Sequence, residues 1–292
     1  MMGEEIVPRA VSAADAGTLT IGGDMVVNRL GYGATRIPGP GVWGEPQNPG
    51  AVREVLLRCV ALGVNLIDTS DYYGRGVANR WIAETLHPYP PGLVIVTKFG
   101  ARREDDGSWA PAADPQSLRA ACDDNLRNLK LDRLDLVHFR YTEGSGVSLA
   151  ESLDTMRQLQ EEDKIRHVGV SNVNAAQLRE AQGIISVASV QNLFNIENRR
   201  DEDVLDICTA EGIPFMPFFP LAIGALGRAG GAVAAIAERR GATPAQIAIA
   251  WLLARSPMML PIPGTASSAH LEENVAAASI RLTPAELALL DG

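Results

Sequence analysis

Short apolar runs alternate with amphipathic stretches along almost the whole chain. In the longer stretches apolar residues recur at i, i+3 or i+4 and i+7, which predicts helices, and the short runs between them are typical of buried strands. Eight strand–helix units, evenly spread and without a linker, favour one (β/α)8 TIM barrel of the α/β class over a doubly wound sheet. The predicted strands are 26–33, 64–69, 93–98, 134–140, 167–172, 187–192, 213–219 and 259–264.

The N-terminal region departs from this alternation. Residues 1–17 are rich in Ala, Glu and Pro without a period, which predicts a flexible tail. Residues 18–27 form two β-like runs joined by Gly-Gly-Asp, which predicts a β-hairpin that plugs one end of the barrel. We therefore expect a single barrel domain over residues 18–292.

Composition and charge narrow the class of protein. Hydrophobic residues make up 46% of the chain and charged residues 21%, as in globular proteins. The net charge of −9 argues against nucleic acid or an anionic membrane as a partner. No apolar stretch reaches the roughly 18 residues of a membrane span. Three distant cysteines and four histidines without ligand spacing predict a cytoplasmic protein with reduced thiols and no metal, and they leave the oligomeric state open.

Charged residues end three of the predicted strands. Asp68, Lys98 and Arg140 follow apolar runs in the second, third and fourth strands. In a (β/α)8 barrel the reactive groups lie at the carboxyl ends of the strands, so a carboxylate, an ammonium and a guanidinium are expected to meet at one mouth. Each of them alone is equally typical of a solvated loop, and it is the combination that points to a site.

Several longer motifs carry a family resemblance. Residues 68–76 read DTSDYYGRG, residues 96–100 VTKFG and residues 164–172 KIRHVGVSN. With LGYGATR at 30–36 and LPIPGTASSAHLEEN at 260–274, the chain resembles the aldo-keto reductase superfamily from about residue 18 to its end, in particular the bacterial general and pyridoxal-reductase-like aldo/keto reductases. The resemblance implies a (β/α)8 barrel that uses NADPH, or sometimes NADH, to reduce small aldehydes and ketones or to catalyse the reverse reaction. No Rossmann unit is expected, because GYGATR lacks the third glycine of that fingerprint.

The resemblance implies a catalytic set as well. Asp68, Tyr73 and Lys98 match three members of the family's tetrad, in which the tyrosine donates a proton to the carbonyl oxygen while hydride reaches the carbon. We expect the Lys98 ammonium to lower the pKa of Tyr73 and Asp68 to hold that ammonium in place. The adjacent Tyr72 is expected to form part of the pocket wall.

The fourth tetrad position departs from the family. The ungapped match places Arg140 where relatives carry histidine, whereas a match to His138 requires a two-residue deletion in a buried strand. A guanidinium stays charged and only donates hydrogen bonds, so Arg140 is expected to polarise a carbonyl or stabilise an oxyanion. The replacement also leaves open an atypical nicotinamide-dependent reaction in a biosynthetic pathway (alkene reduction, deoxygenation or isomerisation), or a redox-silent NADP-binding regulatory protein. A glycosidase is disfavoured, because no second strand-end carboxylate accompanies Asp68.

The resemblance further implies a cofactor site and a substrate pocket. Where many relatives carry Lys and Arg toward the 2′-phosphate, this chain has Gly264 and His270, so NADH remains possible beside NADPH. Pyridoxal or another aromatic aldehyde is a candidate substrate. The implied cofactor contacts are Gly31, Tyr32, Ser171, Asn172, Gln191, Phe218, Pro220, Leu221, Gly264, Thr265, Ser267, His270, Glu273 and Asn274. The implied pocket walls are Tyr32, Trp43, Tyr72 and Tyr141.

Overall fold

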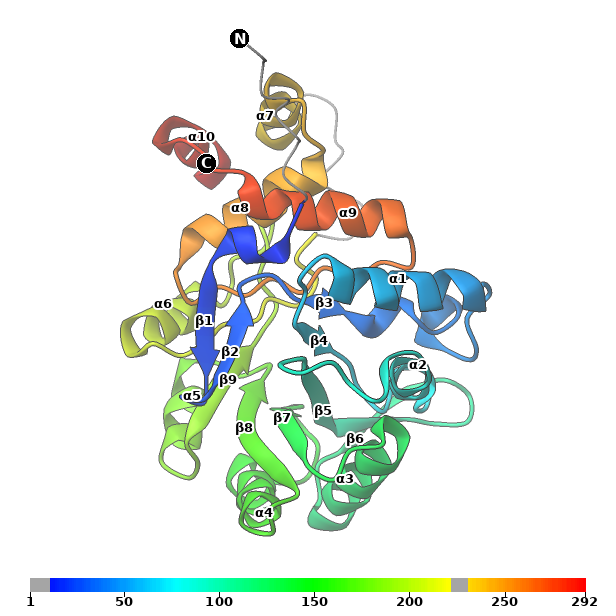
Figure 1. Ribbon diagram of the computed structural model, residues 1–292. Helices are drawn as coiled ribbons and strands as arrows, with labels where there is room; N and C mark the ends of the chain where they lie inside the picture. The colour runs from blue at the N-terminus through cyan, green and yellow to red at the C-terminus, as the bar shows by residue number, and fades with distance from the viewer. Residues whose placement is uncertain (1–10, 222–230) are drawn as a thin grey trace.

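A parallel sheet curls around the centre of the molecule with helices on its outside (Figure 1). The computed structural model describes residues 11–221 and 231–292. The order of the parallel strands is β3-β4-β5-β7-β8-β9, and β6 pairs antiparallel with β5 beyond the barrel. The strands are β1 (Thr18–Ile21), β2 (Met25–Asn28), β3 (Tyr32–Gly33), β4 (Leu66–Asp68), β5 (Val94–Arg103), β6 (Trp109–Ala112), β7 (Leu134–Arg140), β8 (Ile165–Ser171) and β9 (Val187–Gln191).

Helices follow the barrel strands and cover their outer faces (Figure 1). The α-helices are α1 (Pro49–Ala61), α2 (Val77–Leu86), α3 (Pro115–Leu129), α4 (Leu149–Glu161), α5 (Ala175–Gln182), α6 (Glu202–Glu211), α7 (Ala232–Arg240), α8 (Pro244–Arg255), α9 (Ser268–Ala276) and α10 (Pro284–Asp291). The 3-10 turns are η1 (Ala13–Ala16), η2 (Ala34–Arg36), η3 (Pro40–Val42) and η4 (Ala277–Ser279). The predicted (β/α)8 barrel is confirmed.

The barrel closes through two segments that form single bridges rather than strands. Phe215 bridges in parallel to Val190 on one side and to Met259 on the other. The Gly31 amide donates to the Pro261 carbonyl at 2.9 Å, which joins the last segment to the first strand. These bonds complete the ring of eight positions.

The strands predicted over 213–219 and 259–264 are therefore too long. Proline has no N–H to donate to a sheet ladder, so pairing along these segments is reduced to isolated bridges, at Phe215 and Phe218 in the first and at Met259 in the second. The prolines responsible are Pro214, Pro217, Pro261 and Pro263. The prediction of one strand over 26–33 was also wrong, because that range is divided between β2 of the hairpin and β3 of the barrel.

The predicted hairpin is present as β1 and β2, paired antiparallel with Leu19 opposite Val27. Its buried side chains pack against the inward apolar residues of the barrel strands. Residues 13–16, which the composition placed in a flexible tail, form η1, where Ala13 is fully buried and its amide donates to the Leu62 carbonyl at 2.9 Å. Small alanine side chains fit under this turn. Residues 1–10 of the predicted tail lie outside the described residues.

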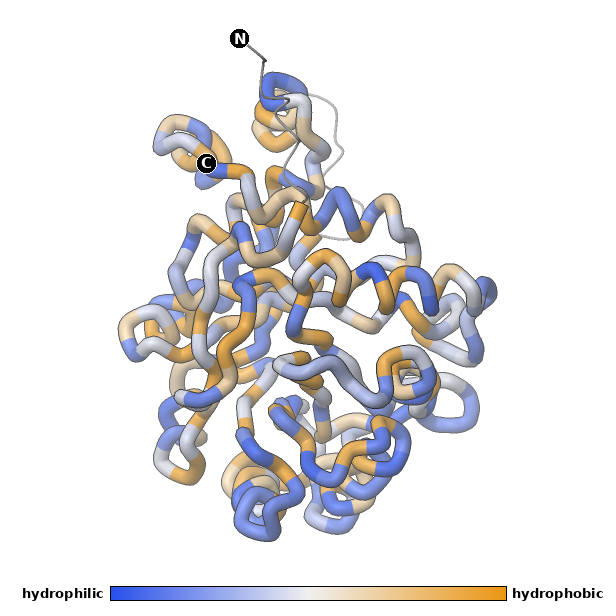
Figure 2. The backbone as a smooth tube through the Cα atoms, viewed as in Figure 1, coloured by the Kyte–Doolittle hydropathy of each residue, from blue (hydrophilic) through white to orange (hydrophobic). Residues whose placement is uncertain are grey.

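The inside of the barrel changes from apolar to polar along the strands. Leu66, Val96 and Leu136 belong to the inner cluster that meets the hairpin, and two residues further on the same faces carry Asp68, Lys98 and the buried His138. Figure 2 shows hydrophobic segments along the strands and hydrophilic ones on the outer loops and helix faces. The hairpin therefore occupies one end of the barrel and leaves the polar end for a site.

Three expectations drawn from the composition concern the cysteines, metal ions and membrane spans. Cys59, Cys122 and Cys208 are buried free thiols in α1, α3 and α6. Over residues 11–221 and 231–292, no group of three or more His, Cys, Asp or Glu side chains is arranged to hold a metal ion. Over the same residues, every helix is too short or too polar to cross a membrane.

Candidate active site

A buried ion pair lies at the polar end of the barrel. The Lys98 ammonium donates to both carboxylate oxygens of Asp68, at 2.8 and 2.7 Å, and to the Thr69 carbonyl at 2.8 Å. The two side chains are only 4% and 3% exposed. The Gln191 side-chain amide donates to the same carboxylate at 2.9 Å. All three N–H groups of Lys98 are therefore in use, and its charge is compensated by Asp68.

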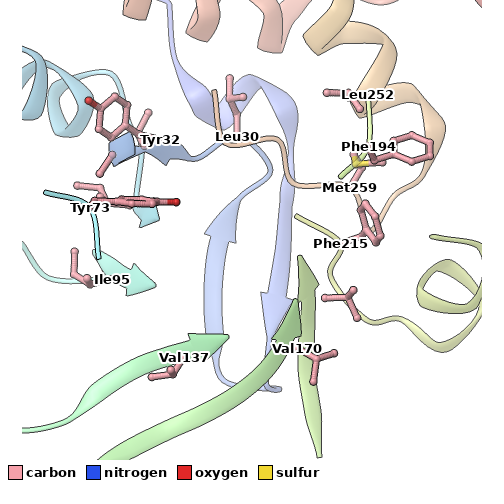
Figure 3. Close-up of a cluster of buried hydrophobic side chains, with 14 of the residues drawn as sticks. Leu30, Tyr32, Tyr73, Ile95, Val137, Val170, Phe194, Phe215, Leu252 and Met259 are labelled. Carbon is pink, nitrogen blue, oxygen red and sulfur yellow. The ribbon is translucent and has the colours of Figure 1, made fainter. Parts of the chain in front are cut away.

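Tyr73 lies in the turn that follows β4, and its ring is beside the Lys98 ammonium, 5.0 Å from the ring centroid. Figure 3 shows the ring near Tyr32 with its hydroxyl directed toward the middle of the barrel. Burial raises the pKa of Tyr73 well above its ordinary value, and the Asp68 carboxylate adds to this, while a hydrogen bond with Thr35 and the charge of Arg140 oppose it. The pKa of Tyr73 is thus raised rather than lowered, which keeps the phenol protonated.

Arg140 ends β7 and faces the same mouth. Its guanidinium carbon lies 5.4 Å from the centroid of the Phe218 ring, and within the part of the chain that the structure describes no carboxylate bonds to it. His138 lies deeper, fully buried, with Nε2 2.7 Å from the Ser189 hydroxyl. Burial lowers the pKa of His138 to about 3, so it stays neutral. The structure therefore brings Arg140, rather than His138, to the mouth.

These groups open into a cavity of about 750 Å³. A second cavity of about 530 Å³ adjoins it, with Thr35, Arg36 and Gly264 among the residues common to both. The first cavity is lined by Gly33, Thr35, Arg36, Gly41, Val42, Asp68, Tyr72, Tyr73, Lys98, Trp109, Arg140, Gln191, Phe218, Phe219, Pro220, Leu221, Ile262 and Gly264. Asp68 supplies the one carboxylate of this lining and is already paired, so the cavity carries excess positive charge from Arg36 and Arg140.

Among the described residues, three buried polar atoms near the ion pair have no hydrogen-bond partner. One is Nδ1 of His138, which pairs with Lys98 across β5 and β7. The other two are the Ser171 hydroxyl oxygen and the Gln191 side-chain carbonyl oxygen, on residues that pair across β8 and β9. Unpaired buried polar atoms are costly and are expected to meet a ligand. A hydroxyl beside an amide carbonyl complements a carboxamide, so the residues present fit the nicotinamide end of the expected cofactor. The Asn172 side chain instead donates to the Tyr141 carbonyl at 2.9 Å.

The adenosine-end residues are divided between the second cavity and α9. Gly264, Thr265 and His270 line the second cavity. Ser267 is the N-cap of α9 and accepts a hydrogen bond from the His270 amide. Glu273 and Asn274 lie farther along α9 and line neither of the two cavities.

Besides Ser171, Asn172, Ser267, Glu273 and Asn274, four more predicted residues line neither cavity: Gly31, Tyr32, Trp43 and Tyr141. Tyr32 pairs with Ile67, so its side chain takes the outward face, where it is fully buried and donates to the Thr265 carbonyl at 2.7 Å. Gly31 lies one layer below the mouth, where an added Cβ would be 2.9 Å from a methyl group of Leu66. Trp43 and Tyr141 are also absent from both linings. The direction of side chains along β3 is the reason for Tyr32.

The sequence reasoning missed one cavity wall. Trp109 starts β6, lines the cavity, and meets Tyr72 edge to face with ring centroids 5.3 Å apart. Its indole lies 4.2 Å from the Arg103 guanidinium carbon, which is also 5.1 Å from the Trp43 ring. The Asp106-Gly107 pair between β5 and β6 is a hairpin signal that was available in the sequence. Other lining residues outside the predicted set are Gly33, Thr35, Arg36, Gly41, Val42, Phe219 and Ile262.

The fold and the site define a (β/α)8 barrel with a buried Asp–Lys pair and a protonated tyrosine at its open mouth. The chain belongs to the aldo/keto reductase family, a family of oxidoreductases, whose profile matches residues 29–292. It is 46% identical over 280 residues to pyridoxine 4-dehydrogenase of Escherichia coli, covering 94% of this chain and 97% of that protein. It is 41% identical over 290 residues to an uncharacterized oxidoreductase of Schizosaccharomyces pombe, covering 99% and 94%.

Solved structures agree with this assignment. An aldo-keto reductase from Klebsiella pneumoniae in complex with NADPH superimposes with a TM-score of 0.80 at 28% identity, covering 94% of this chain and 93% of that one. A thermostable aldo-keto reductase in complex with the inhibitor epalrestat gives a TM-score of 0.81 at 27% identity, covering 94% and 98%.

Proposed function

We propose that the protein is a cytoplasmic, NADPH-dependent reductase of aldehydes or ketones, in which Tyr73 is the proton donor. The observation that carries this proposal is the position of the Tyr73 ring, which lines one cavity together with the Asp68–Lys98 pair and Arg140. The unpaired Ser171 and Gln191 atoms beside the pair support a carboxamide-bearing cofactor there.

When bound, a reduced nicotinamide supplies the hydride that adds to the carbonyl carbon. As the C=O electron pair moves to oxygen, the Tyr73 hydroxyl donates its proton to that oxygen and an alcohol forms. The Lys98 ammonium, held by Asp68, stabilises the phenolate left on Tyr73, and Arg140 donates an N–H to the developing oxyanion. Solvent then returns a proton to Tyr73. The reverse order of steps oxidises an alcohol.

The preference for NADPH over NADH is part of the proposal. The second cavity carries Arg36 and His270 on its lining, together with the Thr265 hydroxyl, and these groups suit a phosphate ester. The Klebsiella pneumoniae relative was solved with NADPH. Gly264 contributes no charge, so we expect a smaller preference for NADPH than a lysine there would give.

For the substrate we propose an aromatic aldehyde of the pyridoxal type, or the corresponding alcohol in the reverse direction. The similarity to the Escherichia coli pyridoxine 4-dehydrogenase supports this class. Aromatic rings of Tyr72, Trp109 and Phe218 on the cavity lining provide the flat apolar contacts that such a ring needs.

Replacement of Tyr73 by Phe tests the proton donor. Tyr73→Phe is expected to lower kcat for pyridoxal by at least roughly 100-fold, because a positioned acid contributes that much to carbonyl reduction. The Kd for NADPH, measured by fluorescence titration alongside NADH, is expected to stay within about threefold, well under 1.4 kcal/mol. The matched control is Tyr72→Phe, which removes the adjacent hydroxyl and is expected to retain kcat within about tenfold. Normal turnover by Tyr73→Phe would show the assignment to be wrong.

Arg140, taken alone, favours a second candidate function. A permanent cation at the mouth also suits an enolate, as in alkene reduction or isomerisation. Arg140→His separates the two: if the native protein is inactive on aldehydes and the variant gains activity on them, the native reaction is of this second kind. If neither oxidises bound NADPH with a broad panel of aldehydes, the redox-silent role is favoured.

A further inference from the structure

In the part of the chain that the structure describes, Arg140 has no ionic partner, whereas the other central cation of the site, Lys98, is fully hydrogen-bonded. Each N–H of Lys98 is bonded, two to Asp68 and one to the Thr69 carbonyl. Among the described residues, by contrast, the Arg140 side chain makes no hydrogen bond or ion pair, and its guanidinium lies over the Phe218 ring. A guanidinium over an aromatic face retains its edge N–H groups for other acceptors. A negatively polarised oxygen that enters the cavity near Tyr73 will therefore meet Arg140.

A guanidinium differs from the histidine imidazole that relatives carry at this position in the number of acceptors it binds. Its planar fork binds two coplanar oxygens side by side, whereas an imidazole offers one N–H to a given site. Arg140 lines the same cavity as Tyr72 and Tyr73, and its positive charge opposes the rise in the pKa of both tyrosines. One N–H is thus available for the carbonyl oxygen and a second for an oxygen next to it.

The aromatic residues that line the cavity indicate what kind of molecule carries this second oxygen. Trp109 and Tyr72 both line the cavity, 5.3 Å apart at their centroids, and the Arg103 guanidinium, which is not part of the lining, lies over the Trp109 ring. Phe218 lies on the side of Arg140, from the segment that follows the barrel bridge at Phe215. Aromatic surfaces from two sides favour a flat ring over a short aliphatic keto acid.

We propose that Arg140 is a specificity-determining residue that recognises aromatic aldehydes carrying a hydroxyl or phenolate oxygen ortho to the aldehyde. The two oxygens of such a molecule are coplanar and adjacent, as the guanidinium fork requires. This inference rests on the proposed function, since it names the substrate class for the same site. Arg140 contacts both oxygens, and Tyr73 still supplies the proton to the carbonyl oxygen.

The test compares 2-hydroxybenzaldehyde with 4-hydroxybenzaldehyde, which has the same hydroxyl at a position that Arg140 does not reach. The measured quantity is the ratio of kcat/KM for the ortho and para isomers with NADPH, divided by the same ratio for chemical reduction by borohydride. The wild-type protein is expected to favour the ortho isomer by roughly 10-fold or more, the range of a hydrogen bond to a charged group. Arg140→Gln is expected to remove most of this preference. Arg140→Lys, which keeps the charge but not the fork, is expected to lose the larger part of it.

Arg102→Gln is the matched control, because Arg102 is an exposed arginine of β5 that bonds to Glu104 and lies outside the cavity lining. It is expected to keep the wild-type ratio. An equal ratio in the wild-type protein and in Arg140→Gln would overturn the inference, as would the absence of an ortho preference in the wild-type protein.

A binding experiment keeps this result separate from that of the proposed function. Calorimetric titration of the two isomers into the protein with NADP⁺ requires no turnover. If no aldehyde is reduced but the ortho isomer still binds more tightly through Arg140, the proposed function fails and the recognition stands. If both isomers are reduced and neither the rates nor the affinities depend on Arg140, the recognition fails and the proposed function stands.

Discussion

The ion pair between Asp68 and Lys98 makes a quantitative prediction about stability. In Lys98→Met the carboxylate keeps its bond from Gln191 but loses two charge-assisted bonds of 2.7 and 2.8 Å. Each such bond contributes about 1.5–3 kcal/mol, and removing one partner of a buried pair typically costs about 3–5 kcal/mol. Because Asp68 lines a cavity that water can enter, we expect the lower end, a loss of about 3 kcal/mol in the free energy of unfolding.

The double variant gives the decisive comparison. Asp68→Asn alone leaves the ammonium without its counter-charge and is expected to cost a similar amount. Asp68→Asn combined with Lys98→Met removes both charges and retains an acceptor for Gln191, so it should be about 1–2 kcal/mol less stable than wild type, and more stable than either single variant.

Urea denaturation followed by tryptophan fluorescence measures these free energies. The control is Lys164→Met, which breaks an exposed pair with Asp123 of similar length, 2.9 Å, and is expected to change the stability by less than about 1 kcal/mol. If the two single losses simply add in the double variant, the pair is not electrostatically coupled and the reasoning is refuted.

Two further predictions concern other buried groups. Burial raises the pKa of Asp71 to about 7, so between about pH 4 and 7 the folded protein retains a proton that the unfolded chain releases, and stability falls across that window. Asp71→Asn should therefore be neutral near about pH 4 and stabilising by about 2 kcal/mol above pH 7, and denaturation at both pH values checks the sign. An alanine Cβ at Gly169 would lie 2.6 Å from the His138 ring and 2.6 Å from a backbone carbonyl of β9, so Gly169→Ala should cost about 3 kcal/mol. Gly50→Ala at the start of α1 meets ordinary contact distances and should be near neutral, and equal melting temperatures for the two alanine variants would contradict this packing.

The sequence was most informative where side-chain alternation and strand ends coincide. Asp68 and Lys98 were predicted to meet because each ends an apolar run on the inward face, and they form the ion pair. The prediction that Tyr32 lines the site was wrong by the same rule, because its pairing with Ile67 turns its side chain outward. The register of a two-residue strand cannot be predicted from its own residues. Trp109 was missed because β6 lies outside the eight-fold repeat that organised the prediction.

The hydrophobic pattern likewise could not predict how far strand pairing extends in the last two segments of the barrel. Apolar runs over 213–219 and 259–264 are typical of buried strands, and their burial is as expected. Whether a buried run is also a paired strand depends on its amide protons, which a hydropathy pattern does not report. The four prolines in these runs carry that information, because a proline has no amide proton to donate.

The proline-interrupted bridges also make the barrel mechanically uneven. Between β5 and β8 the wall is held by continuous ladders, whereas the closing side depends on isolated bonds such as those at Phe215 and Gly31. Local opening requires the least free energy where the fewest backbone bonds must break. The residues that follow these bridges, including Phe218 and Gly264, line the cavity, so the part of the barrel wall with the fewest backbone bonds lies beside the site. Lys98 of the ion pair lies on β5, at the edge of the continuously paired wall. A ligand that contacts both parts of the wall would therefore oppose local opening of the weakly paired side.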